Sequence, residues 1–478
     1  RKYNEVYNRI ICDPGVAKEI SDHFTFDVPG AKFMPAYRNK FWDGKIRLFN
    51  ALTCTLYGGL NGYVEEFCKS RNYEVEYITD FSCEEFSLKE ARDFIETLNM
   101  PEKYKPRDYQ LEAFVHGVRE RRALLLSPTA SGKSFIIYLL TRYYNARTLI
   151  IVPTTSLVSQ LASDFTDYGF ISDTFVHRIY SGQDKQTDKP IVISTWQSLY
   201  KMPKEYFEQF DVVIGDEAHL FKATSLISIL SKLDSCKYRF GFTGTLDGTQ
   251  THKLVLEGLF GPAKQFITTK ELMEKGIVSD FEIKCLILKH PDDVCEEFKD
   301  KSYQDEIQYL ISNEQRNKFI KNLAVSLGKN TLVLYQMVEK HGEILYNMIK
   351  NTKNIGDRKV FFVHGGVEGD DRERIRGIVE SESNAIVVAS YGTFSTGINI
   401  RNLHNVILAS PSKSRVRILQ SIGRGLRIGD SKNEMTLYDI ADDLRVGTHT
   451  NFTLQHFMER INIYSGEGFE FKIFNTEI

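Results

Sequence analysis

The 478-residue sequence has little of what marks several protein classes. Its seven cysteines are scattered, odd in number and never spaced C-x-x-C, so neither a disulfide framework nor a zinc site is expected. No apolar run approaches the roughly 18 residues that span a bilayer, and the segment YNEVYNRIICD is not a signal peptide. A net charge of -2 provides no overall positive field for nucleic acid. These absences argue against membrane and disulfide-rich proteins and predict a cytosolic one.

The rest of the composition is ordinary for a globular chain, with 42% hydrophobic and 26% charged residues at a length that suits about three domains. Short apolar runs alternate with helical stretches over residues 150–242, and a second such series covers residues 331–441. This alternation is typical of parallel sheets with helices on both faces. We therefore predict an α/β protein with two parallel-sheet lobes in tandem, preceded by a small separate α+β domain. The expected bounds are 1–100, 101–275 and 276–478.

The segment SPTASGKS, residues 127–134, is similar to a phosphate-binding loop, although Ser127 stands in place of the first glycine. The pattern alone is weak evidence, since a Gly-Lys-Ser/Thr triplet arises by chance in about one chain in four of this length. It lies, however, between two apolar runs, as expected for a buried strand that leads into a helix N-terminus. Lys133 would then contact the β- and γ-phosphates and Ser134 would ligate Mg²⁺. The cofactor-binding candidates here are Thr129, Ala130, Ser131, Gly132, Lys133 and Ser134.

An acidic pair follows a second apolar run, in the tetrapeptide Asp216-Glu217-Ala218-His219. Roughly one chain in a few hundred contains this tetrapeptide by chance. At the end of a buried strand, Asp216 can hold Mg²⁺ and Glu217 can orient and deprotonate a water molecule. The alternative is an acidic helix cap. Together with Thr243-Gly244-Thr245, these residues resemble the motifs of superfamily 2 helicases.

That resemblance covers residues 104–428 and implies two RecA-like lobes that bind ATP and Mg²⁺. YKPRDYQ is similar to the adenine-reading segment, which implies nucleotide contacts from Arg107 and Gln110. QSIGRGLR is similar to the final motif of the family, whose two arginines lie on one helix face and reach the γ-phosphate. Asn399 in STGINI departs from the acid that many relatives carry. By resemblance, the remaining catalytic and nucleotide-contacting residues are Gln420, Arg424, Arg427, Gly397 and Asn399.

Loop-end hydroxyls and amides match segments with which the family grips nucleic-acid phosphates. Such groups bind phosphate without reading bases, although ordinary loop chemistry explains each of them equally well. The resemblance implies contacts from Pro153, Thr154, Thr195, Trp196, Gln197, His364, Gly365 and Ser395.

The stretch PGAKFMPAYRNKFWDGKIRLFN interleaves cations with aromatic side chains. Lys40, Lys45 and Arg47 are opposed only by Asp43, which suits a surface that holds a DNA backbone. The alternative is an amphipathic hairpin whose aromatics are core residues. The Trp-Asp-Gly turn and the domain order resemble the UvsW-type branched-DNA helicases of tailed bacteriophages.

The sequence thus predicts an ATP-dependent DNA helicase or translocase that remodels forks, Holliday junctions and R-loops. By that resemblance it acts in the cytoplasm of a bacterial host, with DNA as its partner, no membrane contact and a monomer as the working hypothesis. The alternatives are an RNA helicase, a restriction-type DNA translocase and a nucleotide-gated DNA clamp. The chain ends soon after the second lobe, which leaves no room for the nuclease of a restriction system.

Overall fold

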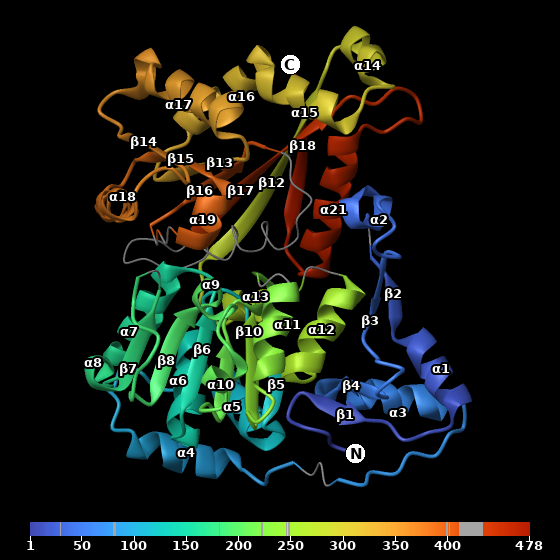
Figure 1. The fold of residues 1–478 in the computed structure, drawn as a ribbon. Coiled ribbons are helices and arrows are strands. Elements are labelled where there is room, and N and C mark those ends of the chain that lie inside the picture. Colours follow the sequence, from blue (N-terminus) through green and yellow to red (C-terminus); the bar gives the residue numbers. More distant parts are fainter. Residues whose placement is uncertain are drawn as a thin grey trace. The chain divides into compact units, whose positions relative to one another are not determined.

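The computed structural model describes residues 1–28, 30–79, 83–180, 182–220, 223–244, 246, 249–397, 400, 402–410 and 434–478. Their contacts divide the chain into two compact units, a first unit of residues 1–127 with 132–266 and a second unit of residues 267–478 with 128–131. Each unit is built on one parallel sheet, drawn as arrows in Figure 1. The predicted pair of parallel-sheet lobes is therefore confirmed. No helix of the described ranges is long and apolar enough to cross a bilayer.

The sheet of the first unit has seven strands over the described residues, and every pairing is parallel. In spatial order they are β11 (Ala263–Gln265), β5 (Arg122–Leu126), β10 (Tyr238–Thr243), β9 (Val212–Gly215), β6 (Thr148–Val152), β8 (Ile191–Thr195) and β7 (Val176–Ile179). Because β5, β10 and β9 are neighbours and parallel, their carboxyl ends meet at one edge of the sheet.

Helices of the first unit connect these strands, as predicted for alternating α/β structure. Central strands such as β6 are buried along their whole length, which explains their continuous apolar sequences. The helices and 3₁₀ turn are α4 (Leu88–Thr97), α5 (Asp108–Glu120), α6 (Lys133–Tyr144), α7 (Thr155–Asp167), α8 (Ser172–Phe175), α9 (Trp196–Leu199), α10 (Lys204–Phe207), η3 (Ala218–Leu220), α11 (Ala223–Lys232) and α12 (Gln250–Phe260).

The sheet of the second unit also has seven parallel strands in the part that the structure describes. Their order is β14 (Val360–Val363), β15 (Ile386–Ser390), β13 (Thr331–Tyr335), β16 (Asn405–Leu408), β17 (Glu434–Asp443), β12 (Asp280–Lys289) and β18 (Phe471–Glu477). The associated helical elements are α13 (Thr269–Glu274), α14 (Asp292–Phe298), α15 (Tyr303–Ser312), α16 (Glu314–Ser326), η4 (Val338–Gly342), α17 (Glu343–Lys350), η5 (Lys353–Ile355), α18 (Gly369–Ser381), α19 (Tyr391–Gly397) and α21 (Phe452–Gly466).

The amino-terminal region combines two small antiparallel sheets with short helices. One sheet pairs β1 (Tyr7–Arg9) with β4 (Thr55–Tyr57), beside α1 (Pro14–His23), η2 (Gly58–Leu60) and α3 (Asn61–Ser70). The other pairs β2 (Thr25–Asp27) with β3 (Lys45–Arg47) and forms an arm that ends in η1 (Ala31–Phe33) and α2 (Pro35–Arg38), visible in Figure 1.

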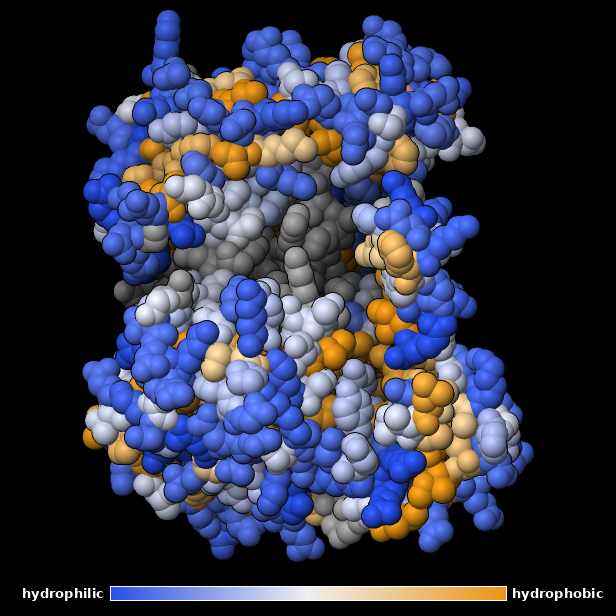
Figure 2. All heavy atoms as spheres, viewed as in Figure 1, coloured by the Kyte–Doolittle hydropathy of each residue, from blue (hydrophilic) through white to orange (hydrophobic). Residues whose placement is uncertain are grey.

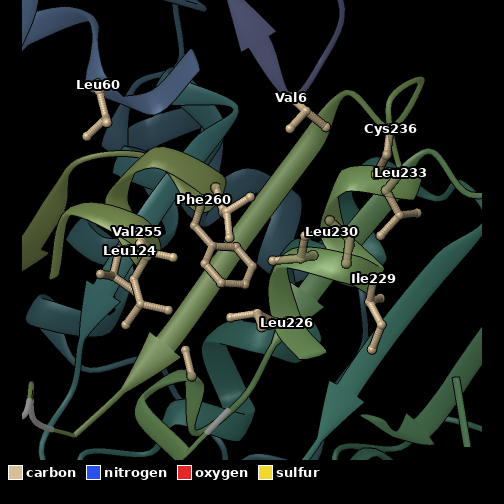
Figure 3. Packing of buried hydrophobic residues seen from close by; sticks show 14 of the residues in the cluster. Val6, Leu60, Leu124, Leu226, Ile229, Leu230, Leu233, Cys236, Val255 and Phe260 are labelled. Carbon is tan, nitrogen blue, oxygen red and sulfur yellow. The ribbon is translucent and has the colours of Figure 1, made fainter. Parts of the chain in front are cut away.

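This amino-terminal region shares a hydrophobic core with the first sheet. Val6 and Leu60 belong to the same buried cluster as Leu124 and Phe260, as Figure 3 shows. The packing against α12 is so close that a Cβ on Gly59 would lie 1.9 Å from the carbonyl oxygen of Glu257. The Tyr63 hydroxyl donates to the Glu257 carboxylate at 2.7 Å. Residues before the first lobe are thus built into the first unit.

Candidate functional site

The loop 127–134 joins a buried strand to a helix N-terminus, as its sequence predicts. Residues Ala123–Leu125 of β5 are fully buried, and α6 begins at Lys133. The helix cap, Gly132, has φ 82°, a left-handed conformation that favours glycine. A Cβ there would also lie 2.3 Å from the Gln110 side-chain nitrogen. Glycine is therefore required both by the backbone and by the close approach of Gln110.

Of the two predicted adenine-reading residues, Gln110 contacts this loop directly and Arg107 contacts Gln110. Gln110 is in the first turn of α5, where its carbonyl oxygen accepts a hydrogen bond from the Arg107 backbone at 3.0 Å. Its amide nitrogen donates to the Gly132 carbonyl at 3.5 Å. The structure thus brings Gln110 to Gly132 of the phosphate loop, 22 residues away in sequence, and Arg107 is held to Gln110.

Lys133 is engaged with the acidic pair. Its ammonium group donates to the Glu217 carboxylate at 2.5 Å, and both side chains are largely shielded from solvent. Asp216 follows β9 and is buried, and its carboxylate accepts a hydrogen bond from the Glu217 backbone at 2.8 Å. The carboxyl ends of β5 and β9, which lie on either side of β10 at one edge of the sheet, place these groups together. Three residues predicted to act on one phosphate therefore form one cluster.

The electrostatics of this cluster favour a cation. Burial is the main cause that raises the pKa of the Asp216 carboxyl, and the adjacent Glu217 charge raises it further. The Lys133 charge acts in the opposite direction and lowers that pKa. Carboxylates and the Ser134 hydroxyl form an all-oxygen donor set, which is the set that Mg²⁺ prefers. The residues present therefore fit a magnesium ion that also binds phosphate oxygens.

Glu217 has an unusual backbone. Its φ of 50° lies in the left-handed region, which costs a residue other than glycine about 1–3 kcal/mol. The next turn is fixed by His219, whose ring nitrogen Nδ1 lies 2.5 Å from the Thr243 hydroxyl at the end of β10. This contact connects the acidic tetrapeptide to the motif that begins at Thr243. The last residue of that motif, Thr245, lies outside the described residues.

Tyr168 is a site residue that the sequence did not reveal. Its hydroxyl lies 2.9 Å from the hydroxyl of Ser134, and its ring contacts those of Tyr104, Phe135 and Tyr138. Tyr168 follows α7 and belongs to no recognisable motif, so its only signal is the fold, which returns this helix end to α6. It holds the hydroxyl that we assign to Mg²⁺.

The predicted phosphate-gripping residues of the first unit are found at the ends of β6 and β8. The Gln197 amide donates to the Pro153 carbonyl at 3.4 Å, which brings the two segments together. The Thr154 hydroxyl accepts from the Leu157 backbone and caps α7, and the buried Thr195 hydroxyl bonds with Ser198. These two hydroxyls therefore have local structural roles. Trp196 begins α9 and is partly buried.

The predicted residues of the second unit lie at the ends of its parallel strands. His364 follows β14, and its ring nitrogen Nδ1 accepts from the Gly366 backbone at 3.1 Å, with Gly365 between them. Ser395 and Gly397 belong to α19. Asn399, Gln420, Arg424 and Arg427 lie outside the described residues.

The amino-terminal cations lie on the arm formed by β2 and β3. Arg47 pairs with Asp43 at 2.5 Å, and Lys45 lies 3.9 Å from Asp27. Asp27 thus opposes Lys45 in addition to the Asp43 that the sequence had suggested. Lys40 is exposed, and among the described residues no ion pair involves it.

Comparisons with known proteins agree with these features. Three family models match: "DNA helicase UvsW, N-terminal" over residues 2–78, "Type III restriction enzyme, res subunit" over 103–248 and "Helicase conserved C-terminal domain" over 314–429. The chain is 36% identical to the ATP-dependent DNA helicase uvsW of Enterobacteria phage T4, over 97% of this chain and 96% of that protein.

A solved structure and a second relative also match most of the chain. The crystal structure of T4 UvsW matches with a TM-score of 0.52 at 34% identity, over 99% of this chain and 98% of that one. The DNA 3'-5' translocase XPB2 of Sulfurisphaera tokodaii is 26% identical over 73% of this chain and 85% of that protein. The full-length match, together with the nucleotide-site motifs, shows that this chain belongs to the UvsW family of superfamily 2 ATP-dependent DNA helicases.

Proposed function

We propose that this chain hydrolyses ATP to remodel branched DNA, including forks, Holliday junctions and R-loops, in recombination, repair and replication. The observation that supports ATP hydrolysis is the ion pair of Lys133 with Glu217 beside the buried Asp216, and the similarity to the ATP-dependent DNA helicase uvsW supports DNA as the substrate. Residues 1–100 bind the DNA, residues 101–275 bind ATP, and residues 276–478 form the second motor lobe. The setting is the cytoplasm of a bacterial host.

The ion pair gives the site a defined resting state. Lys133 neutralises Glu217 until phosphate oxygens compete for its ammonium group. Once Lys133 moves to the β- and γ-phosphates, Glu217 is released to orient and deprotonate the attacking water. Nucleotide binding and activation of the base are therefore one exchange of partners.

Asp216 and Ser134 would hold Mg²⁺. When bound, the ion neutralises charge that develops on the phosphoryl oxygens. Gln110 orients the adenine from its position against Gly132. By family resemblance, Gln420, Arg424 and Arg427 supply the remaining contacts to the γ-phosphate, and Gly397 and Asn399 line the same site.

The nucleic-acid surface is assigned to loop ends and to the amino-terminal arm. Backbone groups near Pro153, Gln197 and Gly365 suit phosphate, because they lie at the carboxyl ends of parallel strands. The exposed arm that carries Lys40 supplies the second contact region. Phosphate contacts of this kind hold DNA without reading its sequence.

The test is the rate of phosphate release with single-stranded DNA, duplex, forked DNA or RNA as the cofactor. Forked DNA should stimulate most, and Lys133→Ala should retain less than about a tenth of the stimulated rate, since a lost phosphate clamp costs several kcal/mol in the transition state. Stimulation by RNA alone would favour an RNA helicase. DNA binding without any hydrolysis would favour a nucleotide-gated clamp.

A further inference from the structure

The end of the amino-terminal arm exposes apolar side chains. We call residues 34–44, between β2 and β3, the arm tip. Phe41 is 86% exposed, and Met34 and Tyr37 are 45% and 42% exposed. Figure 2 shows apolar spheres among hydrophilic ones in this region. Single exposed apolar residues are common on proteins, so the surroundings of Phe41 decide whether it has a function.

The backbone around Phe41 is held by specific contacts. The Phe41 amide donates to the Ala36 carbonyl at 2.9 Å, and the Lys40 amide donates to the Tyr37 carbonyl at 3.0 Å. Lys40 has φ 58°, so the chain reverses sharply just before Phe41. A Cβ on Gly44 would lie 3.0 Å from the Tyr37 ring, which shows how closely the turn packs. The tip is thus an ordered turn and not a loose loop.

The following residues strengthen this turn. The Trp42 indole donates to the Lys45 carbonyl at 2.8 Å. Asp43 accepts from the Lys45 backbone at 3.1 Å and pairs with Arg47. Tyr37, Trp42 and Asp43 therefore have partners inside the arm. Among the described residues, no aromatic or cation contact involves the Phe41 ring, which projects from a fixed base.

The charges beside Phe41 suit a nucleic acid. Lys40 adjoins it in sequence, and Arg38 is exposed at the end of α2 with a hydrogen bond to the Lys32 carbonyl. Two exposed cations that precede an exposed ring in the same turn match a nucleotide, whose phosphate is anionic and whose base has two apolar faces. In a continuous duplex both faces are covered by neighbouring base pairs. An uncovered face exists where the stack is interrupted.

We propose that Phe41 stacks on an unpaired base at a branch point while Lys40 and Arg38 contact the flanking phosphates. The inference rests on the proposed function, and it assigns the choice of branched over continuous DNA to one aromatic side chain. Stacking on an aromatic ring is tolerant of sequence, because every base has a π-face. The arm tip therefore recognises an interruption of the stack and not a base sequence.

The experiment compares binding to a synthetic fork with 2-aminopurine at its branch point and to an uninterrupted duplex with 2-aminopurine at its centre. Phe41→Ala should weaken fork binding about 5- to 100-fold, as expected for the loss of one stacked base, and leave duplex binding unchanged. Phe41→Trp should retain fork binding, and wild type and Phe41→Trp alone should quench 2-aminopurine at the branch point. Leu52→Ala is the matched control, since Leu52 is 97% exposed in another turn of the same region.

Equal fork affinity of Phe41→Ala and wild type would overturn the inference, as would an equal loss on fork and duplex. Phosphate release stimulated by a short single strand should be the same in all four proteins. A wild-type protein with no fork preference or no DNA-stimulated hydrolysis would refute the proposed function itself. The two failures are therefore distinguishable.

Discussion

The ion pair between Lys133 and Glu217 makes the Glu217 carboxylate compete with the phosphates of ATP for the Lys133 ammonium group. The Lys133 ammonium group must leave a carboxylate at 2.5 Å before it can bind phosphate. In the mechanism that we propose, the same contact keeps Glu217, the proposed base, neutralised in the absence of ATP. A substitution that removes the Glu217 charge should therefore strengthen ATP binding and weaken hydrolysis.

Glu217→Gln tests this expectation. We expect kcat to fall at least about 100-fold, because a positioned general base contributes that much or more. ATP should bind severalfold more tightly, since Lys133 no longer has to leave a charged partner. Single-turnover hydrolysis and titration with a fluorescent ATP analogue measure the two effects. Weaker ATP binding would mean that Glu217 helps to hold the nucleotide and does not restrain Lys133.

Tyr168→Phe tests the support of Ser134. Loss of the hydroxyl at 2.9 Å removes a hydrogen bond with a net value of about 0.5–1.5 kcal/mol, so the Mg²⁺ concentration for half-maximal activity should rise about 2- to 10-fold. Tyr138→Phe is the control, since Tyr138 lies in the same aromatic cluster but its hydroxyl accepts from Arg142. In a Ser134→Ala background, Tyr168→Phe should add nothing. An additive effect would show that the Tyr168 hydroxyl acts independently of Ser134.

At the scale of elements, the contact of η2 and α3 with α12 attaches the amino-terminal region to the first sheet. Gly59→Ala would place a methyl carbon against the backbone oxygens of Glu257 and Gly258, which cannot move as a side chain can. We expect a loss of about 1–3 kcal/mol in the free energy of unfolding. Chemical denaturation measures it. Gly62→Ala, with no atom near the added carbon, should be neutral or slightly stabilising.

The sequence predicts elements well where local pattern decides them. Alternating apolar runs indicate β5, β6, β9 and the helices between them, and the loop 127–134 is recognisable from its neighbours. The sequence did not reveal the long strand β12 or its partner β18. Strand β12 follows no motif, and β18 is largely exposed. The shared core around Val6 is equally hidden, since periodicity shows which face is apolar but not what covers it.

The candidate site also contains residues that the sequence predicts and residues that it does not. Lys133, Asp216 and Gln110 were predictable because a motif contains them and parallel strands bring strand ends together. The ion pair with Glu217 depends on side-chain geometry, and Tyr168 depends on where α7 ends. No sequence pattern contains either fact.

At the scale of the molecule, stability should depend on pH through a histidine buried in the second unit. Burial is the main cause that lowers the pKa of His341 to about 3, and the Arg316 charge lowers it further. Neutral His341 donates from Nε2 to Asn317 at 3.2 Å and accepts at Nδ1 from Ser410 at 2.9 Å. The unfolded chain binds a proton near pH 6.5, whereas the folded chain does not.

The stability that depends on a neutral His341 is fully present above pH 6.5, the pKa in the unfolded chain, and it is lost as the pH falls toward about 3, the pKa in the folded chain. Below about pH 6 we expect the contribution of His341 to lower the free energy of unfolding by about 1.4 kcal/mol for each pH unit. Unfolding midpoints between pH 5 and 7.5 measure the slope. His341→Gln should reduce that slope by close to one proton, whatever its midpoint at neutral pH. An unchanged slope would assign the dependence to other histidines.

The net charge of -2 makes the binding of DNA depend on local cations. Replacing Lys40, Lys45 and Arg47 by glutamine should reduce the salt dependence of fork affinity by about one to three phosphate contacts. The lower end is expected, because Asp27 and Asp43 already neutralise two of the three. Fork affinity measured from 50 to about 200 mM salt gives the slope. Lys18→Gln, on α1, is the control, and basal ATP hydrolysis should survive in every variant.

The shared core of the amino-terminal region and the first sheet has a mechanical consequence. A tethered module would let its DNA swing freely, and the motor could advance without pulling on it. Here the amino-terminal region that carries the arm shares a core with the first sheet through Val6 and Leu60, and its Gly59 packs against α12. We therefore expect a load applied at the arm tip to reach the sheet whose strand β5 leads into the loop before Lys133. Mechanical resistance at the arm should therefore be transmitted through the shared core to the nucleotide site.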